Sequence, residues 1–269
     1  MTRKTKIIAT IGPSCSKPSL LKKMIQKGVN VCRLNFSHLS HERAKEIISS
    51  VKTINQELSV HTAIMADLQG PKIRIKKIHN KNGELSTIKG QKIRVGNSKD
   101  CDLSVDYRGF AKDIEKGDVV LIEDGKIILK VLETDKKTNA TLRSVSSGVI
   151  KERKGINLPN TNIKMNSMTK KDFSDLKFVL SENIDWIALS FVRKKEDVIS
   201  LQRRIKKSGS TARVIAKIEK PEAVKNIEEI IDCADGIMIA RGDLGVELPA
   251  HKVPVLQKKI VNKCRFASK

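Results

Sequence analysis

The sequence predicts an α/β fold in which βα units make up most of the chain and a β-rich segment interrupts them. Short apolar runs alternate with stretches of helical periodicity in both outer parts of the chain, a pattern typical of a parallel sheet. Between residues 76 and 168 the pattern changes to short alternating runs with turn signals. The 269 residues are 39% hydrophobic, which is enough for one sizeable core and a small second domain.

The first segment, residues 1–75, predicts strands at 6–12, 29–36 and 63–68. The helix between the first two strands has apolar side chains at positions 20, 21, 24 and 25 on one face. Gly28 follows that helix and predicts its C-terminal cap. The next helix has apolar residues at helical spacing from Ala44 to Leu58.

The middle segment, residues 76–168, predicts an inserted β domain. Its alternating runs lie at 92–95, 119–122, 126–132 and 140–145. Asp124-Gly125 lies between two of these runs and predicts a hairpin with a type I′ turn, because that turn needs positive φ at both central residues.

The last segment, residues 169–269, returns to the βα pattern. Thr169, with Asp172 three positions later, resembles a capping box at a helix start. Further strands are predicted at 186–192, 214–218 and 236–240, with helices between them and a final helix at 255–264. A (β/α)₈ barrel needs eight strands. The two outer segments therefore predict a (β/α)₈ barrel that is incomplete within this chain.

Composition argues against several classes of protein. No apolar run approaches the roughly 20 residues that span a bilayer, and the N-terminal apolar stretch is broken at Gly12-Pro13, so we expect a cytoplasmic protein without a membrane partner. Five widely spaced cysteines predict reduced thiols. The net charge of +23 would suit nucleic acid, but the lysines are dispersed and aromatic residues are only 3%, so no nucleic-acid partner is expected.

Polar residues are dense at the C-terminal ends of the predicted strands, where such barrels carry their active sites. They lie at 33–38, 67–74, 217–219 and 241–243. A single cluster of this kind is often a helix cap, whereas clusters at matching strand ends favour a shared site. Arg33 and Arg74 offer bidentate donors for phosphate, and Gly242 lets an anion approach the backbone closely.

Two carboxylates and one ammonium group predict the chemistry of this site. Glu219 and Asp243 come from adjacent strands and predict a Mg²⁺ site. Lys217 alternates with Glu219, so both side chains face the same side of their strand. An ammonium beside Mg²⁺ is expected where negative charge develops, on a phosphoryl group or an enolate. A solvated ion pair between Lys217 and Glu219 is the alternative interpretation.

At these residues the sequence resembles the pyruvate kinase family. The resemblance is carried by TKIIATIGPS at 5–14, RLNFSH at 33–38, KGINLP at 154–159, IAKIE at 215–219 and DGIMIARGDLGVELP at 235–249. It implies a truncated TIM barrel of the phosphoenolpyruvate/pyruvate type, with a β-barrel lid that closes over the barrel mouth and excludes water. The implied activity is that of a glycolytic phosphotransferase that transfers phosphate from phosphoenolpyruvate to ADP, giving pyruvate and ATP. The family forms homo-oligomers, usually tetramers.

The resemblance also implies roles for single residues. Lys217 would be catalytic, neutralising the transferring phosphoryl group and the developing enolate. Mg²⁺ would be held by Glu219 and Asp243. The phosphoenolpyruvate contacts would be Arg33, Gly242 and Asp243, and the nucleotide contacts Asn35, His38, Arg74 and Lys154.

A potassium site is the one cofactor position where this sequence departs from many relatives. The family's K⁺ ligands match Asn35, Ser37, Asp67 and the carbonyl group of Leu68. Members that need K⁺ carry Glu where this chain has Lys72. A lysine ammonium can stand in for the ion, so we expect that K⁺ is not required.

The chain ends before the segments in which the family continues with a seventh strand, a catalytic threonine, an eighth strand and a C-terminal domain. We therefore expect the chain as given to be catalytically silent. One alternative is a non-catalytic remnant or fragment that keeps the binding residues. Another is a Mg²⁺-dependent barrel lyase acting on oxaloacetate-like acids, but that class has no counterpart for the β insert or the Lys154 segment.

Overall fold

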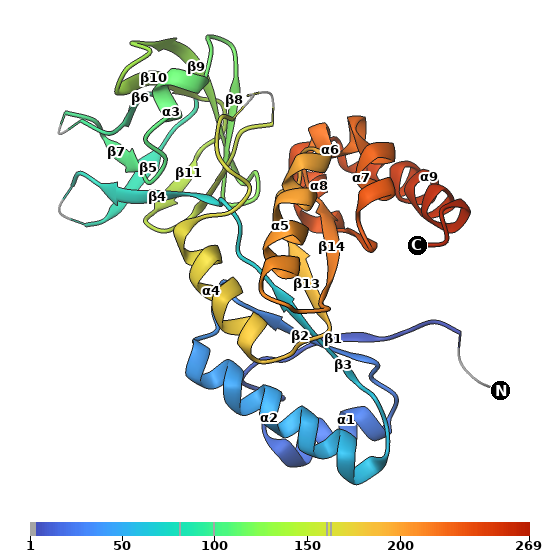
Figure 1. Cartoon of the computed structure of the whole chain (residues 1–269). Helices are drawn as coiled ribbons and strands as arrows, with labels where there is room; N and C mark the ends of the chain where they lie inside the picture. The colour runs from blue at the N-terminus through green and yellow to red at the C-terminus, as the bar shows by residue number, and fades with distance from the viewer. Residues whose placement is uncertain (1–3, 81, 99, 160, 162) are drawn as a thin grey trace.

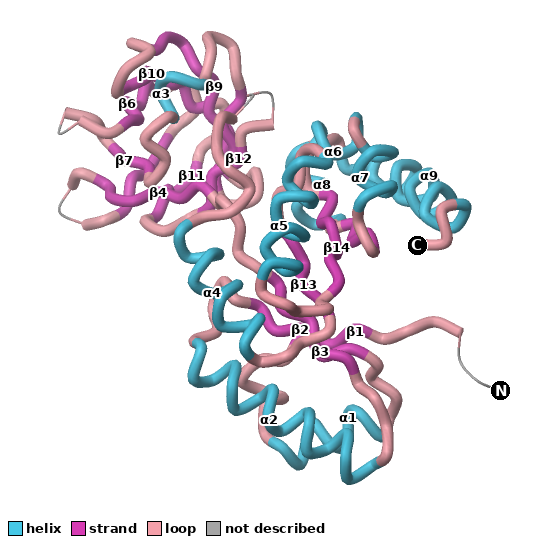
Figure 2. The backbone as a smooth tube through the Cα atoms, viewed as in Figure 1, coloured by secondary structure: helices cyan, strands magenta, loops and turns pink. Residues whose placement is uncertain are grey.

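The computed structural model describes residues 4–80, 82–98, 100–159, 161 and 163–269, so the first three residues of the predicted barrel segment lie outside it. Two units are visible. One is an open parallel sheet covered by helices, and the other is a β barrel set beside it (Figure 1). Helices are concentrated in the first unit and strands in the second (Figure 2).

The parallel sheet has the strand order β1-β2-β3-β13-β14-β15 within the described residues. These strands are β1 (Ile8–Thr10), β2 (Val31–Asn35), β3 (Ala63–Asp67), β13 (Trp186–Leu189), β14 (Arg213–Ile218) and β15 (Gly236–Ile239). Every neighbouring pair is parallel, and Asp67 lies opposite both Asn35 and Ala188 in the register. Spatial order follows chain order, as in a (β/α)₈ barrel. The predicted incomplete barrel is thus confirmed.

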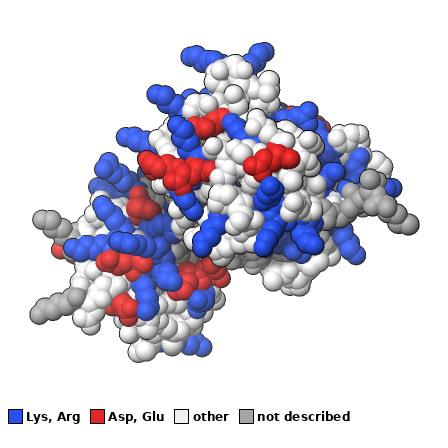
Figure 3. Space-filling view, turned by 90° about the horizontal axis from the view of Figure 1, so that it is seen from below, with Lys and Arg blue, Asp and Glu red and all other residues white. Residues whose placement is uncertain are grey.

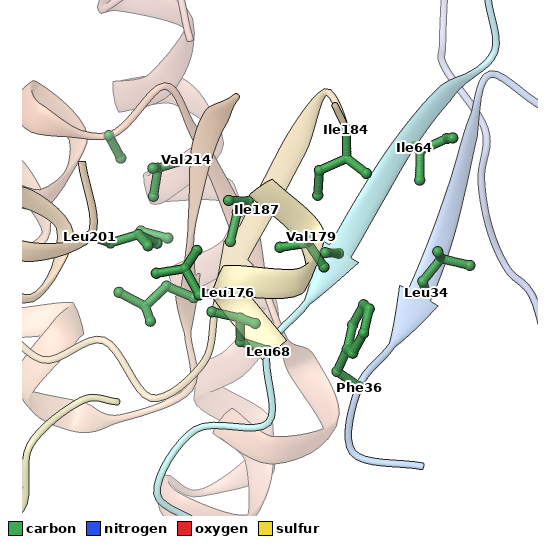
Figure 4. Close-up of a cluster of buried hydrophobic side chains, with 14 of the residues drawn as sticks. Leu34, Phe36, Ile64, Leu68, Leu176, Val179, Ile184, Ile187, Leu201 and Val214 are labelled. Atoms are coloured by element: carbon green, nitrogen blue, oxygen red, sulfur yellow. The ribbon is translucent and has the colours of Figure 1, made fainter. Parts of the chain in front are cut away.

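Helices connect these strands and form most of the unit's outer layer. They are α1 (Pro18–Gln26), α2 (His41–Leu58), α4 (Lys170–Ser181), α5 (Lys195–Lys207), α6 (Pro221–Lys225), α7 (Ile227–Cys233), α8 (Arg241–Glu247) and α9 (Val253–Phe266), with a 3₁₀ turn at Ala250–Lys252. Leu34, Ile64 and Ile187 of the strands belong to the same core as Val179 of α4 and Leu201 of α5 (Figure 4). The opposite face of the sheet buries Met65, Ala188 and Ile215.

The predicted helix ends agree with the structure in two places and differ in two others. Gly28 follows α1 with φ of 96°, and Thr169 with Asp172 forms a capping box at α4. The helix predicted to begin at Pro221 is divided at Asn226 into α6 and α7. The segment that starts at Arg241 was expected only as a strand end, whereas it forms the short helix α8.

The second unit is a closed barrel with the order β10-β6-β7-β4-β12-β8-β9 in the described part of the chain. Its strands are β4 (Ile73–Ile78), β6 (Lys92–Gly96), β7 (Leu103–Val105), β8 (Val119–Ile122), β9 (Ile127–Thr134), β10 (Asn139–Ser144) and β12 (Gly155–Asn157). A short helix, α3 (Phe110–Asp113), and a ribbon of β5 (Glu84–Thr87) and β11 (Gly148–Lys151) complete it. Closure removes exposed strand edges.

The barrel's hairpin and its own core explain why this segment folds as a unit. Asp124 and Gly125 have φ of 57° and 88° between β8 and β9, as the predicted type I′ turn requires. The buried side chains include Ile75, Val95, Leu103, Phe110, Leu129 and Leu142. The strand β4 already begins at Ile73, slightly before the boundary at residue 76 drawn from the sequence.

The chain passes from the sheet to the β barrel through a tight loop after β3. Gly70 has φ of 70°, and a β-carbon there would lie 2.7 Å from Phe191 and 2.9 Å from Ser190, so the position requires glycine. The Gly70 N–H donates a hydrogen bond of 3.0 Å to the buried carboxylate of Asp172 at the start of α4. The loop is thereby held against the ends of β3 and β13.

The structure can be compared with the expectations that composition gave for membrane spans, surface charge and cysteines. In the described residues, no helix has both the length and the apolar character to cross a membrane. Lys and Arg are dispersed over the face seen in Figure 3 and mixed with acidic groups. The five cysteines, Cys15, Cys32, Cys101, Cys233 and Cys264, are free thiols, as predicted.

Candidate active site

A buried ammonium group lies among the side chains at the C-terminal ends of strands β3, β13 and β14. The Nζ atom of Lys217, near the end of β14, lies 2.9 Å from Glu219 Oε1, 3.1 Å from Asp67 Oδ1 and 2.8 Å from Ser190 Oγ. The side chain of Lys217 is 10% exposed and that of Glu219 is 2% exposed. The ion pair of the alternative interpretation is present, but it is buried rather than solvated, because water is largely excluded from both side chains.

Burial and neighbouring charges act in opposite directions on Lys217. Burial lowers the pKa of the ammonium, but the carboxylates of Glu219 and Asp67 outweigh it and hold that pKa above its ordinary value. Lys217 therefore stays charged at neutral pH. A fixed positive charge in a site of low dielectric stabilises an anion more strongly than it would in water.

Asp67 links three strand ends. Its Oδ2 accepts a hydrogen bond of 2.7 Å from Arg33 Nε, and its Oδ1 faces Lys217. Arg33 also donates from a terminal nitrogen to Thr10 Oγ1 at 2.7 Å. The structure thus brings Arg33, Asp67 and Lys217, from β2, β3 and β14, into one connected group.

Ser190 is a member of this group that the sequence reasoning missed. Its hydroxyl lies just past β13 and donates to the carbonyl oxygen of Leu68 at 2.6 Å. The hydroxyl in turn accepts from Lys217, so it connects the ends of β3 and β14. Its position near the C-terminal end of the predicted strand 186–192 was the available signal, but a serine at a strand end is more often a helix cap.

The two carboxylates predicted to hold Mg²⁺ are close enough to influence each other. Burial raises the pKa of Glu219, Lys217 opposes that rise, and the negative charge of Asp243 adds to it. Glu219 Oε2 accepts a hydrogen bond of 2.7 Å from the backbone N–H of Phe191. The described residues contain no group of three or more His, Cys, Asp or Glu side chains arranged for a metal.

This donor set fits a hard divalent cation that takes part of its coordination from substrate and water. Mg²⁺ commonly uses one or two carboxylates from the protein. Glu219 and Asp243 repel each other electrostatically, so a cation between them would favour the charged form of both. Gly242, beside Asp243 in the first turn of α8, has open space at the position of a β-carbon, since no described atom outside its chain neighbours and its own helix backbone lies within 4 Å.

The remaining positions on the barrel side lie around the end of β2 and the loop after β3. Asn35 Oδ1 accepts a hydrogen bond of 3.1 Å from the Ser37 N–H, and the exposed His38 follows. The carbonyl group of Leu68 is engaged by Ser190. The side chain of Lys72 packs toward β12, since a β-carbon at Gly155 would be 2.9 Å from its Cε.

Two of the predicted nucleotide contacts belong to the β barrel and are paired within it. Lys154 Nζ lies 2.8 Å from Glu123 Oε1 in the β8–β9 turn. Arg74, in β4, donates to the Arg153 carbonyl oxygen at 3.1 Å. The Lys154 ion pair lowers the pKa of Glu123 to about 2. Both basic residues are half-buried.

Known proteins similar to this chain are pyruvate kinases. A family profile described as pyruvate kinase, barrel domain, matches residues 2–269. A pyruvate kinase of Clostridium perfringens is 41% identical over 99% of this chain and 57% of its own length. One from Thermococcus litoralis is 39% identical over 100% of this chain and 57% of its own length. One from Sporosarcina psychrophila is 40% identical over 99% of this chain and 46% of its own length.

The matches cover nearly all of this chain but only part of each relative. This chain spans about half the length of the curated relatives that it matches. The profile, in contrast, covers the sheet, the inserted β barrel and every strand end described above. The chain therefore belongs to the pyruvate kinase family.

Proposed function

We propose that this chain supplies the catalytic and ligand-binding half of a glycolytic phosphotransferase that acts on phosphoenolpyruvate and ADP. The observation that carries the proposal is the buried Lys217 ammonium, held between Asp67 and Glu219 at the strand ends. Arg33 and Gly242 would contact phosphoenolpyruvate, and Asn35, His38, Arg74 and Lys154 the nucleotide. We propose further that residues 1–75 and 169–269 act as the barrel and 76–168 as its lid.

In the proposed reaction an oxygen of the ADP terminal phosphate forms a bond to the phosphorus of phosphoenolpyruvate. The bond from that phosphorus to the enol oxygen breaks, and the enolate left behind takes up a proton to give pyruvate. Lys217 would stabilise the moving phosphoryl group and the enolate oxygen by its fixed charge. Asp67 and Ser190 would keep the ammonium in place. The lid would exclude water, which otherwise accepts the phosphoryl group.

Glu219 and Asp243 would hold Mg²⁺, with Asp243 also near the substrate. When bound, the ion would supply Lewis-acid neutralisation of phosphate and enolate oxygens. We also propose a cytoplasmic location, which the free thiols support, and a homo-oligomeric assembly of the whole protein.

A hybrid protein tests the proposed function. This chain is joined to the part of the Clostridium perfringens relative that it does not cover, and pyruvate formation is followed in a coupled assay. Turnover that requires both phosphoenolpyruvate and ADP is expected, because the hybrid holds the proposed catalytic and ligand-binding residues. A folded hybrid without turnover would favour the non-catalytic remnant.

Potassium independence is a separate expectation. In the hybrid, turnover in tetramethylammonium buffer is expected to lie within about tenfold of that in potassium buffer, because the Lys72 ammonium would stand in for the ion. The Lys72→Glu variant should lose activity without K⁺ and regain it on addition. A rate for the unaltered hybrid that rises more than tenfold with K⁺ would contradict the expectation.

A further inference from the structure

Three buried polar residues meet where the lid touches the barrel. Lys220 follows Glu219 directly and precedes α6, Glu247 is the last residue of α8, and Asn157 is the last residue of β12 in the lid. All three are less than 9% exposed. A cavity of about 30 Å³ at this junction is lined by Asn157 and Lys220 together with Lys72.

The contacts converge on one carboxylate oxygen. Glu247 Oε1 accepts from Asn157 Nδ2 at 2.7 Å and from Lys220 Nζ at 2.6 Å. Lys220 also lies 5.9 Å from the centre of the Phe191 ring. Glu247 Oε2 and Asn157 Oδ1 are buried and have no hydrogen-bond partner in the described part of the chain. A carboxylate buried in this way depends strongly on the two donors that it has.

Each of the three residues adjoins a residue of the proposed site. Lys220 is next to Glu219, α8 starts with the turn that carries Gly242 and Asp243, and Asn157 is in the same short segment as Lys154. Other hydrogen bonds at the junction, such as that from Gly70 to Asp172, involve the connecting loops. The bond from Asn157 to Glu247 joins a lid strand to the barrel unit itself.

We propose that Glu247 is a positioning residue that holds the lid strand β12 in place against the barrel unit, with Lys220 fixing its carboxylate and Asn157 as the lid's contact. The predicted effect on catalysis rests on the proposed function, whereas the predicted effect on the position of β12 does not. Polar contacts of this kind determine relative position more than they stabilise, because desolvation offsets much of the attraction. Losing the contact would release Lys154 from its position relative to Glu219 and Asp243.

The structural test is hydrogen exchange in the hybrid protein, compared segment by segment with the unaltered protein. Asn157→Asp places a second carboxylate against Glu247 and leaves the Lys220 pair intact, so β12 and the segments 68–72 and 163–168 should exchange at least tenfold faster. Asn97→Asp adds the same charge at an exposed lid position and should leave these segments unchanged. Exchange in Asn157→Asp equal to that of the unaltered chain would overturn the proposal, as would faster exchange throughout the lid core.

An exchange of partners gives the rescue variant. In Asn157→Asp/Glu247→Gln the amide and the carboxylate trade places, so the new amide can donate to the new carboxylate and Lys220 keeps an anionic partner nearby. The exchange rates of β12 and of the segments 68–72 and 163–168 should return to within about threefold of their values in the unaltered chain. The double variant could have the same melting temperature as the unaltered chain and still exchange fast in these segments. That result would show that the contact does not position the lid.

The catalytic consequence is measured in the hybrid. Asn157→Asp should raise the KM for ADP about tenfold and change the KM for phosphoenolpyruvate less than threefold, because Lys154 moves with the lid and Arg33 does not. Equal effects on both KM values would contradict the positioning role. The exchange experiment needs no turnover, so an inactive hybrid would count against the proposed function and leave the lid contact to be judged by exchange.

Discussion

Replacing Lys217 by methionine in the hybrid is expected to slow phosphoryl transfer by about 10² to 10³-fold, the usual effect of removing a preorganised charge partner. Methionine keeps the apolar stem of the side chain and removes the ammonium group. The Nζ atom of Lys217 lies within 3.1 Å of both Asp67 and Glu219, so its loss removes a cation from two buried carboxylates, of which Asp67 keeps its ion pair with Arg33. The measurement is kcat in the coupled assay, with melting temperature recorded alongside.

The second variant separates charge from position. Lys217→Arg keeps a cation between Asp67 and Glu219, so its melting temperature should stay near that of the unaltered hybrid, while the displaced charge still costs most of the rate. Lys45→Met, on the exposed face of α2, is the matched control and should have normal activity. If Lys217→Met kept more than a few per cent of the rate, Lys217 would not be the catalytic group.

Replacing Glu219 by glutamine or Asp243 by asparagine is expected to weaken Mg²⁺ binding by at least 10- to 100-fold. Each change removes one of the two carboxylates that favour the cation. Binding is measured by calorimetric titration with oxalate present as a substrate analogue. Glu228→Gln, which removes an exposed carboxylate on α7, is the control and should leave the affinity unchanged.

The pH dependence of Mg²⁺ binding follows from the same carboxylates. A ligand must be deprotonated to bind the ion, and the pKa of Glu219 is raised by burial and by Asp243. Affinity should therefore rise with pH through that raised pKa, and this dependence should weaken in Glu219→Gln. Unchanged Mg²⁺ affinity in both single variants would refute the site.

The parts of the site that depend on short-range pattern were predictable from the sequence. Lys217 and Glu219 are two positions apart on one strand, so strand geometry alone places them on the same side, and they are 2.9 Å apart. The hairpin at Asp124-Gly125 was predictable for a similar reason, since few residues tolerate positive φ.

The contacts that depend on long-range pairing were not predictable. Ser190 meets Lys217 because their strands, β13 and β14, are neighbours, and the predicted barrel gives that order but not which side chains at the strand ends touch. Helix α8 contains Gly242 and Gly245, which disfavour helix in isolation, yet it buries Leu244 and Glu247. Asn157 and Glu247 are 90 positions apart, and neither carries a local signal for the other.

The insertion of the lid between β3 and β13 has a consequence for synthesis on the ribosome. The lid strands β4 to β12 are contiguous in the chain and close on one another, so this unit can complete itself as soon as it emerges. Strand β3 must wait for about 120 further residues before its neighbour β13 exists. At about 5 to 20 residues per second, that wait is on the order of 6 to 24 s. The nascent chain would then carry a finished lid beside an unpaired edge of strand β3, and that edge is open to pairing with other chains until β13 emerges.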